Sequence, residues 1–274
     1  MAACKGRFYF DGRLFRSTAL FGEEVFASGV SFYEVLRVMR GICLFMEDHL
    51  LRLRQSASLS GLPFLFDPHF AGHTIRQLIA KNRLKQGNIK LVLHFSEAGK
   101  ASLYAFVISH SYPGPRAYKE GIVTDLYAAV RRDPNVKRIV PDLQLRLKAF
   151  ISRKRIYEAL LVDENGFITE GSRSNVFFIQ GDIIYTAPGE MVLKGITREK
   201  VIEICKTLNH KVIEKPVSIN NLSQMNSAFI TGTSPMVLPV RQIGRVSFPP
   251  SGRVIDRLRN TYNALIEDYL SSGH

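Results

Sequence analysis

The chain has 274 residues, of which 46% are hydrophobic and 22% are charged, which is the composition of an ordinary folded globular protein. This length allows one large domain or two of average size, and no run approaches 18 apolar residues, which excludes a membrane-spanning helix. The net charge of +13 is spread along the chain without a block of five or more basic residues, so it is best explained by a solvated basic surface, and no nucleic-acid or membrane partner is expected.

Two features of the sequence predict a cytoplasmic protein. The first residues lead into the alternating stretch at 8–10 and do not form an apolar secretion segment. The three cysteines, Cys4, Cys43 and Cys205, include no CxxC pair, so we expect reduced thiols and no structural disulfide.

The first part of the chain is predicted to mix strands and helices. Runs rich in β-branched and aromatic residues predict strands over residues 8–10, 14–15, 32–39, 42–45, 89–95 and 103–108. Helices are expected over residues 47–57 and 71–82. The Pro- and Gly-rich segment that follows favours an irregular, extended connection. We therefore expect an N-terminal small domain over residues 1–111, a linker over 112–118 and a C-terminal domain over 119–274.

The second part also mixes the two kinds of element. Four apolar residues from Leu143 to Ile151 have the spacing of an amphipathic helix. Residues 176–179 and 183–185 flank a short polar segment, which is typical of a hairpin. Further elements are expected as strands over 159–162 and 228–230 and as helices over 201–208 and 254–270. Because strands and helices do not alternate regularly, the sequence predicts an α+β fold and not a doubly wound sheet.

Several kinds of site are not supported by the sequence. His69 and His73 lie four residues apart on a predicted helix, but no third ligand is spaced to complete a site, so no metal is expected. The GxSxG, GxxxxGK(S/T), GxGxxG and RNP patterns of hydrolases, nucleotide-binding proteins and RNA-binding proteins are absent.

Residues suited to phosphate and amine chemistry occur at four places. Residues 195–197 precede a predicted helix, where the first N–H groups either bind a phosphate or simply begin the helix. The hydroxyl-rich residues 231–234 follow a predicted strand and form either a second phosphate contact or a plain loop. Lys137, which has apolar neighbours, is either a desolvated nucleophile or a surface lysine. Glu170 lies in a glycine- and hydroxyl-rich turn, either as a positioned acid or as part of a polar loop.

Six segments, in this order along the chain, carry a resemblance to a known family. They are Tyr33-Glu34-Val35-Leu36-Arg37, His49-Leu50-Leu51-Arg52-Leu53, Lys137, Glu170-Gly171-Ser172-Arg173-Ser174-Asn175, Leu193-Lys194-Gly195-Ile196-Thr197-Arg198 and Thr233. From about residue 32 to residue 240 the chain resembles the fold type IV (class IV) pyridoxal-phosphate aminotransferases, a group that includes D-amino-acid and branched-chain aminotransferases and aminodeoxychorismate lyase. The resemblance implies an α+β fold of two domains, a smaller N-terminal α/β domain and a larger C-terminal mixed α/β barrel-like domain, and a homodimer.

The resemblance also implies the cofactor and the residues that hold it. Pyridoxal 5'-phosphate (PLP) would form a Schiff base with the catalytic Lys137. The carboxylate of Glu170 would pair with the pyridine nitrogen, and Leu193 would pack on the ring. The other implied cofactor-binding residues, most of them contacts of the phosphate, are Arg52, Ser174, Ile196, Thr197 and Thr233.

The residues that read the substrate match no subgroup of the family fully. Residues 94–99 lack the R-x-H pair of D-amino-acid aminotransferases, and Asp142 stands where branched-chain enzymes carry a tyrosine. Tyr33 is most similar to the D-amino-acid group. Tyr33, Arg37 and His94 are the candidate substrate-binding residues, and of these Arg37 and His94 are the candidates for binding the substrate carboxylate.

The prediction is therefore a PLP-dependent aminotransferase that moves an amino group between an amino acid, of D-amino-acid or branched-chain type, and a 2-oxo acid. The alternative with the same cofactor is a carbon–carbon lyase of the aminodeoxychorismate type. A remote alternative, suggested by the net charge of +13, is a basic nucleic-acid-binding protein on an inactive scaffold.

Overall fold

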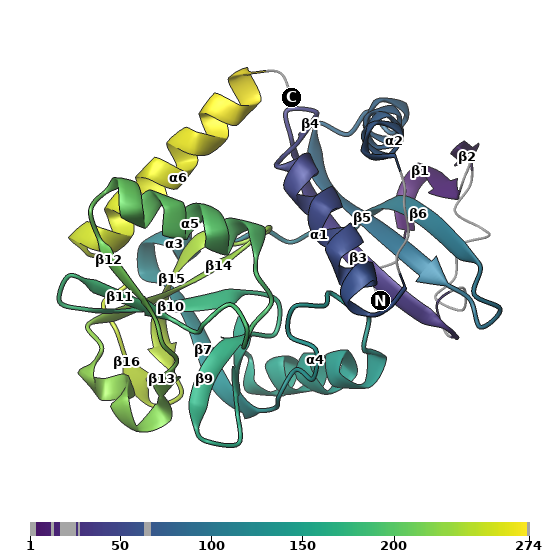
Figure 1. The fold of residues 1–274 in the computed structure, drawn as a ribbon. Helices are drawn as coiled ribbons and strands as arrows, with labels where there is room; N and C mark the ends of the chain where they lie inside the picture. Colours follow the sequence, from purple (N-terminus) through teal and green to yellow (C-terminus); the bar gives the residue numbers. More distant parts are fainter. Residues whose placement is uncertain (1–3, 12–13, 17–25, 27, 63–66, 273–274) are drawn as a thin grey trace. The chain divides into compact units, whose positions relative to one another are not determined.

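The computed structural model describes residues 4–11, 14–16, 26, 28–62 and 67–272 of the chain, which form two compact units (Figure 1). Unit 1 comprises the described residues up to Ser111, together with Val136–Ile139 and those from Ile266 onward. Unit 2 comprises Tyr112–Asn135 and Val140–Leu265. The short segment 136–139 thus belongs to unit 1, although its neighbours on both sides in the chain belong to unit 2.

Unit 1 is built on a six-stranded sheet with the strand order β2-β1-β6-β5-β3-β4. Its strands are β1 (Cys4–Asp11), β2 (Leu14–Arg16), β3 (Val30–Met39), β4 (Ile42–Cys43), β5 (Gln86–Phe95) and β6 (Ala101–Ile108), and each pairs antiparallel with its neighbours. Helix α1 (Met46–Leu59) packs on β3, and α2 (Pro68–Lys81) packs on α1, β1, β4 and β6, so both helices cover one face of the sheet (Figure 1).

The two faces of this sheet differ in chemistry because side chains alternate along each strand. Phe32, Leu36 and Val38 of β3 belong to the apolar core that β3 and β5 form with α1 and α2. Tyr33 and Val35, between them in sequence, belong to a different cluster with residues of β5 and β6. The face of the sheet away from the helices therefore carries the odd-numbered residues of β3.

Unit 2 contains a ten-stranded sheet with the order β12-β11-β10-β14-β15-β7-β8-β9-β13, and β16 pairs with β15. An additional pairing of β9 with β10 closes six of these strands into a barrel. The strands are β7 (Ile122–Ala128), β8 (Glu158–Val162), β9 (Phe167–Gly171), β10 (Asn175–Gln180), β11 (Ile183–Thr186), β12 (Lys211–Glu214), β13 (Val217–Ser218), β14 (Ser227–Gly232), β15 (Met236–Ile243) and β16 (Val246–Ser247).

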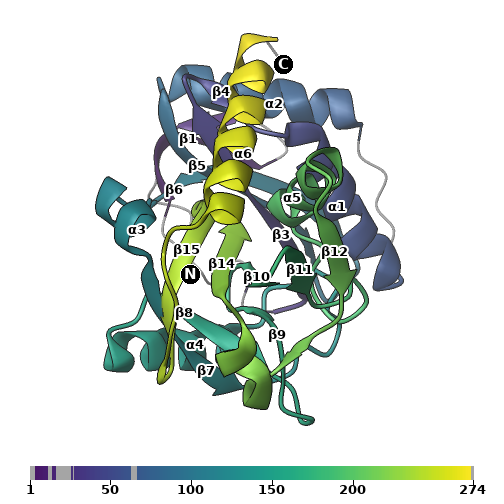
Figure 2. The same ribbon diagram turned by 90° about the vertical axis from the view of Figure 1, so that its left-hand side faces the viewer.

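Helices pack on the outside of this sheet. Helix α5 (Ile196–Thr207) packs on β12 and β14, α4 (Pro141–Lys154) on β8, and α3 (Pro115–Glu120) on β15 (Figure 2). A 3-10 helix, η2, spans Ile219–Gln224, and the last helix, α6 (Arg253–Ser271), begins in unit 2 and ends in unit 1. Within the described part of the chain, no helix has the length and hydropathy needed to cross a membrane.

Most elements expected from the sequence are present, with two differences. Strand β4 ends at Cys43, because Phe45 adopts a left-handed conformation (φ 51°) and starts α1. Residues 115–120 form helix α3 and not an irregular connection, since Pro115 suits the first turn of a helix, where its missing N–H is not needed. The domain limits of 1–111, 112–118 and 119–274 stay a prediction, because a division into compact units does not decide which segments fold independently.

A buried charged cluster fixes α1 on β3. Glu34 points toward α1 and is fully buried; its Oε1 accepts a hydrogen bond from Arg52 Nε, and its Oε2 accepts one from Arg52 Nη2, both at 2.7 Å. His49 Nδ1 lies 2.7 Å from the same Oε2. Burial alone would raise the pKa of Glu34, but the charge and hydrogen bonds of Arg52 and the hydrogen bond of His49 outweigh it and lower that pKa to about 2.

The cluster also sets the proton positions. The ionised Glu34 only accepts hydrogen bonds, so His49 Nδ1 carries the proton and donates it. Burial lowers the pKa of His49, so this imidazole is neutral at neutral pH. One carboxylate therefore balances one guanidinium, and Arg52 is held in a single orientation by two parallel hydrogen bonds.

Replacing Glu34 by glutamine (E34Q) leaves the Arg52 charge buried beside a neutral amide. We expect the free energy of unfolding at pH 7 to fall by about 3–5 kcal/mol. The pKa of Glu34 is about 2 in the fold, below its ordinary value of 4.5, so its ionised form stabilises the wild type above about pH 4.5 and this contribution is lost as pH falls toward 2. The stability gap between wild type and E34Q should therefore narrow in acid.

Urea unfolding at pH 7, 5 and 3 measures this gap. Glu97→Gln is the matched control, because the Glu97 side chain is exposed in the turn after β5. A gap of the same size at all three pH values contradicts the role assigned to the Glu34 carboxylate.

Candidate active site

The site residues expected from the sequence are divided between the two units. Unit 1 carries Tyr33, Arg37, Arg52, His94 and Lys137. Unit 2 carries Glu170, Ser174, Leu193, Ile196, Thr197 and Thr233.

In unit 1, main-chain hydrogen bonds attach the segment that contains Lys137 to the edge of β3. The Tyr33 N–H donates to the Lys137 carbonyl at 3.0 Å, and the Lys137 N–H donates to Ser56 Oγ of α1 at 3.1 Å. The Ile139 N–H donates to the Ser31 carbonyl at 2.9 Å. Residues 136–139 thus act as a short added strand, and the position of Lys137 is set by β3 and α1.

The Lys137 side chain lies against an aromatic ring. Its Nζ is 4.8 Å from the centroid of the Tyr33 ring, and the side chain is half-buried. The Nζ of Lys90, on β5, lies 5.1 Å from the centroid of the same ring, and Lys90 is buried. The interpretation of the sequence missed Lys90, although a lysine within the otherwise apolar run 89–93 was a visible signal.

The other two expected substrate-binding residues share the sheet face of Tyr33 by strand alternation. His94 pairs with Ser31 across β5 and β3, and Ser31 Oγ lies 2.9 Å from His94 Nδ1. Burial lowers the pKa of His94, so the imidazole is neutral at neutral pH and offers hydrogen bonds without a positive charge. Arg37 is buried and lies four residues beyond Tyr33 on β3.

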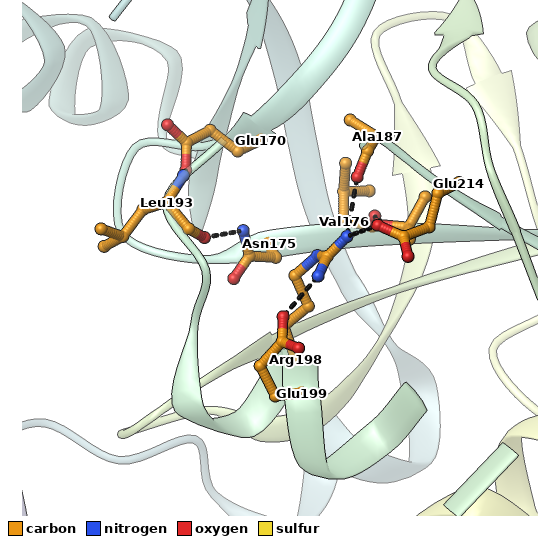
Figure 3. A network of polar contacts seen from close by, with 9 residues as sticks. Glu170, Asn175, Val176, Ala187, Leu193, Arg198, Glu199 and Glu214 are labelled. Carbon is orange, nitrogen blue, oxygen red and sulfur yellow. Dashed lines mark hydrogen bonds and ion pairs between the residues drawn. The ribbon is translucent and has the colours of Figure 1, made fainter. Parts of the chain in front are cut away.

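In unit 2, Glu170 of β9 and Asn175 of β10 flank the turn between these strands and pair with each other where the barrel closes. Glu170 Oε1 accepts a hydrogen bond from Arg131 Nε at 2.7 Å, and Oε2 accepts one from the Leu193 N–H at 3.2 Å. Asn175 Nδ2 donates to the Leu193 carbonyl at 2.8 Å (Figure 3). The main chain of Leu193 is therefore fixed on both sides by this turn.

Ser174 points to a buried acid. Its hydroxyl donates to Glu158 Oε2 at 3.2 Å, and the Ser172 hydroxyl donates to the other oxygen of Glu158. Burial raises the pKa of Glu158. The hydrogen bond from Ser174 to Glu158 thus connects the turn between β9 and β10 to the first residue of β8.

Helix α5 begins beside this turn. Gly195 is the N-cap residue, and Ile196 and Thr197 form the first turn of the helix. Thr197 therefore lies inside the helix and is not its N-cap. A Cβ at Gly195 would lie 2.2 Å from Asn175 Oδ1, so only glycine fits between the turn and the helix start. The main-chain N–H groups at the start of α5 have no partner within the helix, which makes this a place that suits an anion.

Arg198 anchors the same helix from inside. It is almost fully buried; its Nη2 donates to the Ala187 carbonyl at 2.9 Å and to Glu214 Oε2 at 2.7 Å, and its Nη1 pairs with Glu199 (Figure 3). Glu214 ends β12, so these contacts tie the first turn of α5 to the sheet. The Thr197 hydroxyl, for its part, lies 3.4 Å from the Tyr262 hydroxyl of α6.

The end of β14 supplies hydroxyl groups. Thr231 is fully buried and pairs with Asn175 across β14 and β10, so both side chains lie on the same face of the barrel. Within the described residues, Thr231 Oγ1 has no hydrogen-bond partner. A buried hydroxyl left unsatisfied is costly, which indicates that a ligand supplies its partner. Thr233, half-buried in the following turn, was expected from the sequence, whereas Thr231 was not.

Each unit, taken by itself, carries residues of the kinds that the group implied by the sequence requires. PLP requires an amine, an acid for the pyridine nitrogen and donors for the phosphate. Unit 1 carries the amine of Lys137, and unit 2 carries the carboxylate of Glu170, the start of α5 and the unsatisfied hydroxyl of Thr231.

Comparisons with known proteins agree with this chemistry. A D-alanine aminotransferase of Bacillus licheniformis is 29% identical over 230 residues, which cover 80% of each chain. The structure of the Escherichia coli branched-chain amino acid aminotransferase matches with a TM-score of 0.85 and 22% identity and covers 95% of each chain. The structure of a putative 4-amino-4-deoxychorismate lyase from Legionella pneumophila matches with a TM-score of 0.80 and 23% identity, covering 89% of this chain and 94% of that one.

The structural matches are below 25% identity and establish the fold; the predicted α+β, fold type IV architecture is confirmed. The activity rests on a broader match, since the family model "Amino-transferase class IV" matches residues 31–243, most of the chain. The chain therefore belongs to the class IV aminotransferases and is an enzyme that depends on PLP.

Proposed function

We propose that this enzyme moves an amino group between a D-amino acid and a 2-oxo acid, and that Lys137 is the residue that binds PLP covalently. One observation carries the assignment of Lys137: its main chain is fixed on the edge of β3, and its amine lies 4.8 Å from the centre of the Tyr33 ring. Tyr33, which is similar to the tyrosine of D-amino-acid aminotransferases, and the relative named D-alanine aminotransferase support D-amino acids as the first substrates to test.

PLP, when bound, stabilises the negative charge that develops on the substrate α-carbon when that carbon loses its proton. The Lys137 amine, free while a substrate occupies its place, would accept this proton from the α-carbon and hold it for the return transfer. Glu170, which accepts a hydrogen bond at 2.7 Å from Arg131, would pair with the pyridine nitrogen and favour its protonated form. Leu193 would pack against the ring.

The phosphate is assigned to donors from both units. Arg52, held in one orientation by Glu34, provides a positive charge. The N–H groups of Ile196 and Thr197 at the start of α5 provide hydrogen bonds favoured by the helix dipole. The hydroxyl of Thr233 is a further donor, and the buried hydroxyl of Thr231 gains the partner that it lacks among the described residues.

The finer proposals concern assembly and compartment. We propose a homodimer, on the strength of the family resemblance, which light scattering of the purified protein tests. A reducing compartment such as the cytoplasm is supported by Cys43 and Cys205, which are buried free thiols; the side chain of Cys4 lies outside the described residues.

Replacing Lys137 by alanine (K137A) removes the proposed attachment and proton-transfer group. We expect the absorbance of covalently held PLP to disappear and the rate of the half-reaction with an amino acid to fall at least about 100-fold, the usual contribution of a positioned acid–base group. Lys148→Ala is the matched control, because Lys148 is an exposed lysine on α4. A K137A protein that keeps the attached cofactor and normal turnover overturns the assignment.

Replacing Gly195 by alanine (G195A) places a methyl group 2.2 Å from Asn175 Oδ1. Overpacking of this kind costs about 1–3 kcal/mol, so we expect a lower Tm and roughly tenfold weaker PLP binding. The double variant G195A/N175A should lose less stability than the sum of the losses in the two single variants, because alanine at position 175 removes the clash with the added methyl group. Gly252→Ala, with open space around the added methyl group, is the control. If the losses of stability in the two single variants add up in the double variant, the close approach of residue 195 to Asn175 Oδ1 is contradicted.

Stereochemistry and reaction type are tested together by absorbance. Conversion of the bound cofactor to its amine form on addition of D-amino acids, but not of L-amino acids, is the expected result. Conversion by L-branched-chain amino acids alone supports the branched-chain type instead. Release of pyruvate from aminodeoxychorismate without such conversion supports the lyase and contradicts the proposal.

A further inference from the structure

We propose that Lys90 binds the α-carboxylate of the substrate, an inference that rests on the proposed function of Lys137. The sequence assigned the carboxylate to Arg37 and His94. The geometry of unit 1 points to the buried lysine next to them.

Burying Lys90 within a strand has a free-energy cost. It lies in the middle of β5 between Ile89 and Leu91, and only 6% of its surface is exposed. An ammonium group is costly to remove from water, and an apolar residue at this place would serve the sheet better. Buried ionisable groups retained at such a cost are candidates for functional sites.

The surrounding sheet face attracts an anion. On β3, β5 and β6, the residues that share this face by register and alternation are Ser31, Tyr33, Val35, Arg37, Asn88, Lys90, Val92, His94, Ser102, Tyr104, Phe106 and Ile108. None of these described residues is acidic, two are basic (Arg37 and Lys90), and six carry a hydroxyl, amide or imidazole group. A carboxylate is the anion that every amino acid and 2-oxo acid brings to the enzyme.

The distance between the two amines fits the α-carboxylate. Lys90 Nζ and Lys137 Nζ lie 5.1 Å and 4.8 Å from the centre of one ring, so the two nitrogens are at most about 10 Å apart. A substrate whose α-carbon is next to Lys137 has its α-carboxylate one bond away from that carbon. One hydrogen bond of about 2.8 Å then joins this carboxylate to Lys90.

The two earlier candidates fit the α-carboxylate less well. Burial lowers the pKa of His94, so at neutral pH it provides no positive charge. Arg37 lies four residues beyond Tyr33 on β3, about 13 Å along the strand at about 3.3 Å per residue. Lys90 pairs with Val35, two residues closer, and its long side chain reaches back to the Tyr33 ring.

The test compares a substrate that has the carboxylate with one that lacks it. Alanine, in the enantiomer that reacts, and the alaninol of the same configuration are used in the half-reaction, followed by cofactor absorbance. For Lys90→Met (K90M) we expect the half-saturating concentration of alanine to rise about 10- to 100-fold, the usual range for a lost hydrogen bond to a charged group. The reaction with alaninol should change less than about threefold, because alaninol has no carboxylate to lose.

Two further variants and one binding measurement sharpen the test. Lys90→Arg should restore most of the affinity for alanine, since it keeps the charge. Lys100→Met, which removes an exposed lysine from the turn after β5, should behave like the wild type. Propionate, which binds without reacting, should perturb the cofactor spectrum of the wild type at lower concentration than that of K90M.

The outcomes separate this proposal from the assignment of Lys137. Equal losses with alanine and alaninol, or no loss with either, overturn the role of Lys90 while Lys137 stands. Loss of cofactor attachment in K90M, together with normal attachment in K137A, makes Lys90 the attachment residue and overturns both.

Discussion

The hydrogen bonds that attach residues 136–139 to the edge of β3 are the constraint on which the account of this enzyme depends. Through them, a lysine whose neighbours in the chain belong to unit 2 takes its position from unit 1. Strand β3 carries a different function on each face. Glu34 on one face orients Arg52, and Tyr33 on the other face contacts the amine of Lys137. A shift of β3 by one residue would exchange these faces and disable both groups.

In unit 2, the turn between β9 and β10 positions the proposed site residues. The pair Glu170 and Asn175 closes the barrel and at the same time holds both sides of the Leu193 main chain. Asn175 then leaves room only for glycine at position 195, which places the start of α5 beside the turn. The acid assigned to the pyridine nitrogen and the N–H groups assigned to the phosphate are thus positioned by one hydrogen-bonded segment, so that small errors in the turn affect both.

Sequence patterns were sufficient to predict an element or a candidate residue where the signal lies in one contiguous segment of the chain. The last helix was predicted over residues 254–270, within one residue of the observed limits, and the family motifs pointed to Lys137, Arg52 and Glu170, whose roles stay predictions. Sequence patterns were insufficient where the information lies in a pairing between distant strands. The bonds from His49 and Arg52 to Glu34, the contact of Lys90 with Tyr33, and the buried hydroxyl of Thr231 follow from strand register and burial, which single-sequence patterns do not contain.

The central claim is that one particular amine holds the cofactor, although a second buried amine contacts the same aromatic ring. Sodium borohydride fixes the covalent bond between PLP and its lysine, and mass spectrometry of the digested protein then identifies the modified residue. The account predicts that the modification is found on Lys137. Modification of Lys90, or of any other lysine, in place of Lys137 would contradict it.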